Sequence, residues 1–466
     1  MQEYIFPVAV VESHLGSGTE NLPARQTLQI GLNEAKTARF APGGHVILDF
    51  GREMGGGVRI LSASRKICRV RIRFGESLTE CCSEPGGRQN ATNDHSLRDM
   101  HTELVMLSDM TFGATGFRFV RLDFEDEAQL KCVVAANHTL KKKVLYRYDG
   151  TDERIRQIYD AAKRTVDLCA AGKFLWDGVK RDRLVWIGDI HPEMLALTTL
   201  YGRLSAIERS LDFAKEQTPL PGWMNNIPMY SLWWIIILAD YYERTDAAAF
   251  TRRQLGYVEA LLEQMDGCVQ EDGALDYPSY FVDWPTRGQP DEIHGARAIN
   301  VIAAKKAAEL LRTFDRDTTL AESILQRLLK VEITPQSSKQ VLGLKHFAIG
   351  LTDGDREKLV CGGARGMSTF MSYYILTAVA SFDRATAIAM MKEYYGAMLD
   401  KGATTFWEDF DLAWAENACR IDEFPREGQA DIHGDFGAFC YKGFRHSLCH
   451  GWAAGVIQFI RETCRE

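Results

Sequence analysis

The sequence predicts two parts: an N-terminal antiparallel β-sandwich, followed by a larger helical domain that forms a closed α-barrel or an α-solenoid. In the first third, short segments rich in Val, Ile and Phe are separated by glycine clusters, as in antiparallel sheets. From Thr151 onward, apolar residues recur every three or four positions, which is the period of amphipathic helices. This change of period divides the chain into domains of residues 1–148 and 149–466.

The predicted strands are short and mostly alternate polar with apolar residues. They cover residues 4–11, 27–32, 45–50, 58–62, 68–74 and 117–124, and the last strands lie within residues 131–148. A strand, not a helix, follows the triple glycine at residues 55–57, so these glycines do not form a phosphate-binding loop. Residues 79–100 are polar, and we expect a long surface loop there.

The helical pattern begins with apolar residues between Ile155 and Cys169 and continues to the end of the chain. The further predicted helices cover residues 189–213, 230–243, 247–265, 291–314, 318–331, 366–381, 385–398 and 447–464. Roughly 315 residues of helical segments in one piece favour an α-barrel or α-solenoid. Loops on one face of such a scaffold commonly carry the chemistry.

Composition excludes several classes of function. The net charge of the 466 residues is −8, and no long basic run offers phosphate contacts, so we expect no nucleic-acid partner. No stretch approaches about 18 uninterrupted apolar residues, and the N-terminus lacks a secretion signal, so we expect no membrane partner. The cysteines show no metal-type spacing, which favours free thiols in a reducing, cytoplasmic compartment.

The stretch from Trp176 to Glu193 is the main candidate for a functional site. It places Asp177, Asp182 and Asp189 among basic residues and tryptophans, and its first half fits neither a helix nor a strand. Carboxyl groups transfer protons and indole rings stack on sugars, so carbohydrate chemistry is the first hypothesis. The alternative is a solvated ion-pair loop with anchoring tryptophans.

Hydrolysis of a glycosidic bond needs a second carboxyl group. The candidate is Glu408, which follows Trp407 in a loop that is otherwise apolar or hydroxyl-bearing. Each acid also has a structural explanation. Asp189 precedes a predicted helix and is equally well explained as its N-cap. Asp182 could be an ion-pair partner of the neighbouring arginines, and Glu408 could be a solvated charge.

Other candidates are weaker. His450 precedes an apolar helix, where a histidine is more often a hydrogen-bonded core residue than a ligand. We interpret His450, and likewise His191 and His433, as histidines without a set of metal-ligand partners, so we expect no metal. Trp284 is equally well explained as a sugar platform or as a core residue. Neither a GxSxG motif nor a dinucleotide fingerprint occurs, and we expect no cofactor.

Three motifs resemble those of the α-L-rhamnosidases of glycoside hydrolase family 78. The stretch from Asp177 to Asp189 is similar to the family's Asp-Cys-Pro-x-Arg-Glu-x-x-Gly-Trp-x-Gly-Asp signature. Residues 402–408, Gly-Ala-Thr-Thr-Phe-Trp-Glu, resemble the second motif, and residues 447–452, Ser-Leu-Cys-His-Gly-Trp, resemble the third. Residues 48–51, 57–59 and 116–120 also resemble the β-sandwich domain that precedes the catalytic barrel.

This resemblance implies a β-sandwich followed by an (α/α)6 barrel, and hydrolysis with inversion. In the family, the acid of the first motif protonates the leaving group, a role that falls on Asp182. The glutamate of the second motif activates water, a role that falls on Glu408. The substrate-binding residues expected here, from the motifs or as neighbouring candidates, are Asp177, Arg181, Trp186, Asp189, Trp284, Trp407 and His450.

The chain departs from the family at several positions. Asp182 stands where the family has glutamate, which shortens the acid by about one carbon–carbon bond. The chain ends soon after the last predicted helix, so we expect a short member without the family's C-terminal β domain. We therefore predict an inverting hydrolase that acts on a terminal α-L-rhamnosyl or related sugar. The alternatives are a catalytically impaired carbohydrate-binding protein on the same scaffold and a lyase.

Overall fold

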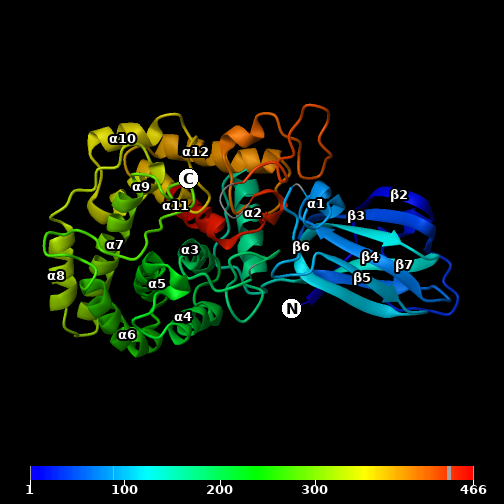
Figure 1. Cartoon of the computed structure of the whole chain (residues 1–466), viewed down its shortest axis with the longest axis horizontal. Helices are drawn as coiled ribbons and strands as arrows, with labels where there is room; N and C mark the ends of the chain where they lie inside the picture. The colour runs from blue at the N-terminus through cyan, green and yellow to red at the C-terminus, as the bar shows by residue number, and fades with distance from the viewer. Residues whose placement is uncertain (1, 88, 182, 438–441, 465–466) are drawn as a thin grey trace.

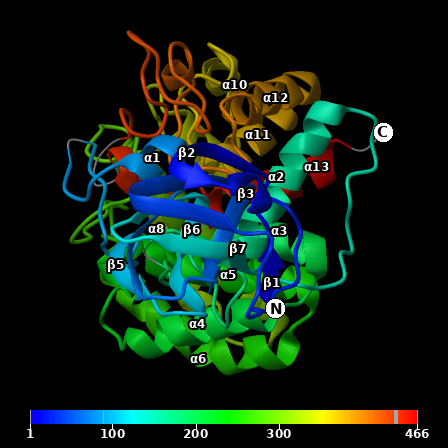
Figure 2. The same cartoon turned by 90° about the vertical axis from the view of Figure 1, so that its right-hand side faces the viewer.

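The computed structural model describes residues 2–87, 89–181, 183–437 and 442–464. Figure 1 shows the strands gathered at one end of the molecule and the long helices at the other. Seen from the strand end, the helices lie behind the sheet (Figure 2). None of the described helices combines the length and apolarity that crossing a membrane requires. All described cysteines are free thiols.

Seven strands form one connected sheet. They are β1 (Gln2–Ile5), β2 (Ala9–Ser17), β3 (Ala38–Ser62), β4 (Cys68–Gly75), β5 (Asp99–Leu104), β6 (Asp109–Phe124) and β7 (Ala128–His138). The order is β1-β7-β3-β6-β4-β5, with β2 paired to β3. The pairs β1–β7, β2–β3, β3–β6, β4–β5 and β4–β6 are antiparallel. The predicted antiparallel pairing is therefore confirmed for most of the sheet, whereas β3 and β7 pair in parallel.

The glycines at residues 55–57 lie within a strand, although the sequence suggested a turn between two strands. The predicted strands 45–50 and 58–62 are parts of the single strand β3. A Cβ atom at Gly56 would lie 2.2 Å from the Ala136 carbonyl oxygen, and one at Gly57 would lie 2.1 Å from that of Phe112. Only glycine lets the neighbouring backbones approach this closely.

Two further strand predictions and one loop prediction were wrong. Residues 27–32 form no strand, and Leu32 is 70% exposed. An alternating segment is stabilised as a strand only when it packs against a neighbouring strand, and this segment has no strand partner among the described residues. The predicted strand 4–11 is interrupted at residues 6–8, where Pro7 lacks an amide hydrogen. The stretch 79–100, which was predicted to be a surface loop, contains most of the short helix α1 (Leu78–Cys82) and the start of β5.

The long helices begin at residue 153. They are α2 (Glu153–Cys169), α3 (Ile190–Tyr201), α4 (Ser205–Gln217), α5 (Pro228–Thr245), α6 (Ala248–Asp266), α7 (Glu292–Thr313), α8 (Thr319–Leu328), α9 (Lys339–Ile349), α10 (Asp353–Val360), α11 (Ser372–Ala380), α12 (Arg384–Asp400) and α13 (Val456–Thr463). Short 3-10 turns are η1 (Thr19–Asn21), η2 (Met224–Asn226), η3 (Leu412–Ala415), η4 (Gly443–Arg445) and η5 (Gly451–Gly455).

Most helix predictions agree with the structure, with the following exceptions. The predicted helix 189–213 is two helices, because Gly202 ends α3 with a φ of 69°. The helices α9 and α10 were not predicted. The start of the predicted helix 447–464 is instead an extended segment and the turn η5.

Six helices pack in a circuit, and one of them is the apolar helix α5, which buries Trp233 and Trp234. Contacts run from α3 to α5, α7, α9, α11 and α13, and from α13 back to α3. Of the remaining long helices, α4, α6, α8, α10 and α12 lie toward the outside in Figure 1, whereas α2 lies between the other helices and the sheet. The loops that join the helices bring distant acidic residues together beside the sheet.

Candidate functional site

Arg181 and Glu408 form a buried ion pair. The Nη2 nitrogen of Arg181 lies 2.8 Å from both carboxylate oxygens of Glu408. Arg181 is 4% exposed and Glu408 is 2% exposed. The alternative explanation of Glu408, beside Asp409, as a solvated surface charge is therefore wrong. A buried and paired carboxylate has a fixed orientation, which suits a group that must act on one substrate atom.

Three carboxylates surround one ring nitrogen of His450. Its Nε2 atom lies 3.6 Å from an oxygen of Glu408, 3.8 Å from one of Asp189 and 4.0 Å from one of Asp177. All four side chains are buried. The structure thus brings together four residues that the sequence pointed to, from three separate motifs.

Asp189 does not cap the helix that it precedes. It occupies the N-cap position of α3, but its side chain accepts no capping hydrogen bond from the described helix. Its Oδ1 atom accepts a 2.8 Å hydrogen bond from the hydroxyl group of Tyr230 on α5. The carboxylate therefore points toward His450 and Tyr230, and the N-cap explanation fails.

The loop around Asp177 is closed by its own backbone and by the third motif. The Oδ1 atom of Asp177 accepts a hydrogen bond from the Leu184 amide, and its carbonyl accepts one from Gly451. A backbone bridge also joins Gly178 to His450. The first and third motifs are thus held side by side.

The second motif pairs with the third through backbone hydrogen bonds. The amide of Glu408 donates to the Ser447 carbonyl, and the amide of Ser447 donates to Oε2 of Glu408, both at 2.9 Å. The Glu408 carbonyl accepts from the indole of Trp452 and from Thr369. Glu408 is therefore fixed at its side chain and at its backbone.

The three candidate tryptophans differ in exposure. Trp186 is half-buried and stands edge-on to Tyr230, with 6.3 Å between ring centroids. Trp284 is half-buried beside Phe281, with the guanidinium carbon of Arg287 5.6 Å from its ring centre. Trp407 is fully buried in the core, against Phe410. Trp186 and Trp284 thus keep surface that a ligand can reach.

The loop that carries Trp284 borders Glu408. Asp283 accepts a 2.6 Å hydrogen bond from Ser368, and the next residue, Thr369, donates to the Glu408 carbonyl. Burial, with Glu408 and then Asp283 as acidic neighbours, raises the pKa of Asp409 to about 7. Asp283 and Asp409 were not predicted as parts of this acidic group. Their places in the sequence could have indicated them, because Asp283 precedes Trp284 and Asp409 follows Glu408.

Asp182, the residue that resembles the family's acid, lies outside the described residues. Its assigned role as proton donor therefore stays a prediction. The flanking Arg183 is described: its guanidinium carbon lies 4.3 Å from the ring centre of Trp176, and it donates to the Ala114 carbonyl.

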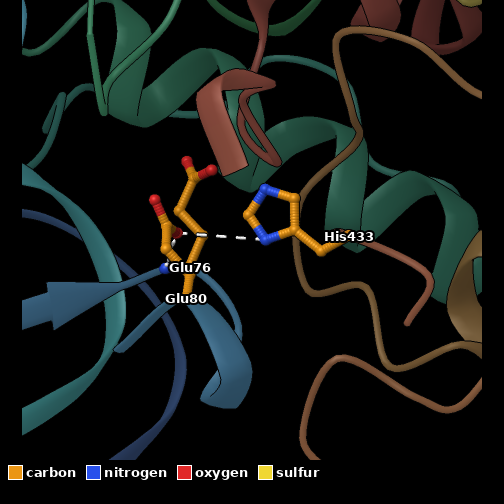
Figure 3. A group of neighbouring side chains, drawn as sticks. All are labelled: Glu76, Glu80 and His433. Carbon is orange, nitrogen blue, oxygen red and sulfur yellow. Dashed lines mark hydrogen bonds and ion pairs between the residues drawn. The ribbon is translucent and has the colours of Figure 1, made fainter. Parts of the chain in front are cut away.

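Two groups of described residues have the donor atoms of a cation site. One consists of Asp177, Asp189 and His450, and the other of Glu76, Glu80 and His433. Figure 3 shows the imidazole of His433 facing the two glutamates of the second group. An ammonium group already lies there, because Nζ of Lys180 is 3.1 Å from a carboxylate oxygen of each glutamate. No sequence motif indicated this group, since His433 is more than 350 positions from both acids.

Comparison with solved structures finds matches over nearly the whole chain. A rhamnosidase from Klebsiella oxytoca with rhamnose bound has a TM-score of 0.77 and 20% identity, covering 100% of this chain and 96% of that one. A glycoside hydrolase family 78 rhamnosidase of Bacillus sp. GL1 has a TM-score of 0.68 and 16% identity, covering 93% and 47%. An α-L-rhamnosidase from Dictyoglumus thermophilum has a TM-score of 0.68 and 13% identity, covering 99% and 51%.

The chain spans nearly all of the Klebsiella protein and about half of the other two. No protein-family model and no curated protein matches the sequence. At these identities the matches establish architecture. The chain therefore has the fold of the α-L-rhamnosidases of glycoside hydrolase family 78.

Proposed function

We propose that the protein is a glycosidase that hydrolyses a terminal α-L-rhamnosyl or closely related sugar with inversion. The observation that carries this proposal is the arrangement of Asp177, Asp189 and Glu408 around His450 on a fold shared with rhamnosidases. Two of the matched proteins were solved with rhamnose bound. The proposed substrate is therefore a small carbohydrate. We also propose that the protein is cytoplasmic and binds neither nucleic acid nor a membrane.

The proposed architecture is the β-sandwich and (α/α)6 barrel that the motifs imply. The circuit of α3, α5, α7, α9, α11 and α13 supports an inner ring of six helices. The continuous sheet around β3 supports a sandwich, because one long strand can bend from one layer into the other. The candidate site lies in loops next to both parts, which fits the proposed domains 1–148 and 149–466.

The proposed mechanism uses one acid and one base. Asp182 donates a proton to the leaving oxygen, while Glu408 removes a proton from the water that attacks the opposite face of the sugar. Asp177 and Asp189 accept hydrogen bonds from sugar hydroxyl groups and stabilise positive charge that develops on the ring. Inversion requires about 6.5–9.5 Å between the acid and base carboxyl groups, which leaves room for the water.

A catalytically impaired carbohydrate-binding protein is the second candidate. Arg181 donates to both oxygens of Glu408, so water must compete for a lone pair on the candidate base. In this second function the same acidic group binds a sugar without cleaving it. The buried carboxylates then serve only as hydrogen-bond acceptors.

A screen of nitrophenyl glycosides, with the α-L-rhamnoside first, separates these functions. We expect release of nitrophenol from the α-L-rhamnoside, and a product of inverted anomeric configuration by NMR. Binding of L-rhamnose by calorimetry without release from any glycoside would support the impaired protein. Neither binding nor release would overturn both proposals, and an unsaturated product would indicate a lyase.

A further inference from the structure

A buried polar cluster joins the sheet to the two loops that carry Arg181 and Glu408. Its centre is Lys180, 5% exposed, whose Nζ atom contacts Glu76 and Glu80 at 3.1 Å each. The same ammonium donates to the carbonyl groups of Phe444, at 2.7 Å, and His446. It therefore links the segment after β4 with the first-motif loop and with the segment before the third motif.

Glu76 is connected to Glu408 through Ser447. Its carboxylate accepts a 2.6 Å hydrogen bond from the Leu448 amide and a 3.2 Å bond from the Ser447 hydroxyl. Ser447 in turn accepts a hydrogen bond from the Glu408 amide at its carbonyl, and its own amide donates to the Glu408 carboxylate. Ser447 is thus the one residue between Glu76, directly after β4, and the candidate base Glu408.

Lys180 is also adjacent in sequence to Arg181, the partner of Glu408. The strand β6 fixes the Lys180 backbone, because Thr115 donates to its carbonyl at 2.9 Å. A Cβ atom at Gly116 would lie 2.7 Å from the Lys180 amide nitrogen, so the loop lies directly against the strand. Arg181 and Glu408 are therefore each anchored to the same part of the sheet domain by separate contacts.

We propose that Lys180 and Glu76 are positioning residues, through which the sheet domain sets the orientation of Arg181 and Glu408. This inference rests on the proposed role of Glu408. Lys180 fills the group of potential cation ligands with an ammonium, which offsets part of the negative charge of Glu76 and Glu80 and ties both glutamates to the first-motif loop. A displacement of about 1 Å at a reacting group can lower turnover about 100-fold, so such anchoring affects rate directly.

The test variant is Lys180→Met combined with Glu80→Gln. The pair removes one positive and one negative charge together, so the net charge of the cluster stays the same, and Glu76 keeps its hydrogen bonds from Leu448 and Ser447. We expect kcat to fall about 10- to 100-fold while KM changes less than about threefold. Glu76→Gln should give the same division between kcat and KM.

Two comparisons separate positioning from general stability. Lys345→Met with Asp355→Asn removes a buried 2.7 Å pair between α9 and α10, far along the chain from the loops. This control should lower Tm as much, and leave kcat within about twofold. In a Glu408→Gln background, the Lys180→Met and Glu80→Gln changes should cause no further loss, because they act through Glu408.

Hydrogen exchange tests the anchoring without any reliance on activity. Amides of residues 177–184 and 445–450 should exchange faster in the Lys180→Met and Glu80→Gln variant than in the wild type or the control. Faster exchange in a protein that cleaves no glycoside would uphold the anchoring and remove only the proposed reaction. Unchanged exchange, a kcat within about twofold of wild type, or losses that multiply in the Glu408→Gln background would overturn the inference.

Discussion

Arg181 holds both carboxylate oxygens of Glu408 through one nitrogen, at 2.8 Å each, although the two residues are 227 positions apart. The sequence suggested Asp182 as the functional partner of Glu408 and treated Arg181 as a substrate-binding residue. The structure shows that Arg181 orients the candidate base itself. Its effect on activity should therefore follow the geometry of this pair.

Arg181→Lys keeps the positive charge and loses the planar guanidinium. A lysine ammonium is a compact charge that cannot reproduce contacts fixed by a planar group, so Glu408 should lose its orientation. We expect kcat on the nitrophenyl α-L-rhamnoside to fall at least about 10-fold with KM nearly unchanged. Arg183→Lys is the matched control, because Arg183 contacts Trp176 and Ala114 instead. Equal losses in both variants would contradict a specific role for Arg181.

Tyr230→Phe removes the hydroxyl group that donates to Asp189. A hydrogen bond to a charged group contributes roughly 1.5–3 kcal/mol, and its loss should leave Asp189 less well oriented toward a sugar. We expect L-rhamnose binding, measured by calorimetry, to weaken roughly 10-fold. Tyr277→Phe, which removes a buried hydroxyl bonded to Asn300, should leave binding unchanged. Unaltered binding in the Tyr230 variant would argue against Asp189 as a sugar ligand.

Asp409→Asn should change how stability depends on pH. The folded protein holds the Asp409 proton up to a pKa of about 7, whereas an ordinary aspartate releases it near 3.8. Protonation of Asp409 therefore stabilises the fold below pH 3.8, and this contribution is lost as pH rises to about 7. Relative to wild type, the variant should gain stability over this range, by at most about 1.4 kcal/mol per pH unit.

Urea unfolding at pH 4.5 and pH 7.5 measures this difference. Asp126→Asn is a control of opposite sign, because hydrogen bonds from Arg69 lower the pKa of Asp126 to about 2. The charged form of Asp126 stabilises the fold above pH 3.8, so this variant should lose stability at neutral pH. A stability gap between Asp409→Asn and wild type that stays constant with pH would refute the raised pKa of Asp409.

Asp182→Asn and Glu408→Gln should each lower turnover at least about 100-fold. Glu408→Gln should also lower the unfolding temperature, because it leaves Arg181 buried without its carboxylate partner. Asp182→Glu should retain or raise activity if the shorter side chain limits proton transfer. Near-wild-type turnover in Asp182→Asn would remove that residue from the role of acid.

The sequence predicted the elements of the fold wherever the spacing of apolar residues matches the buried face of a strand or helix. Alternation identified β4 and the recurring apolar positions identified α2, because each buries one face of a regular element. The pattern failed at Gly55–Gly57, where the glycines serve close approach between strands, and at residues 27–32, where alternation has no sheet to join. Both failures concern neighbours that are distant in the sequence.

The site divides in the same way. The sequence by itself determined the candidate residues, because Asp177, Asp189, Glu408 and His450 lie in recognisable motifs. Only the tertiary structure decided their partners. Arg181 meets Glu408, Tyr230 meets Asp189, and Lys180 meets Glu76 and Glu80 through contacts that span tens to hundreds of positions. Sequence spacing predicts neighbours along one helix or strand, whereas burial of charge selects partners from anywhere in the chain.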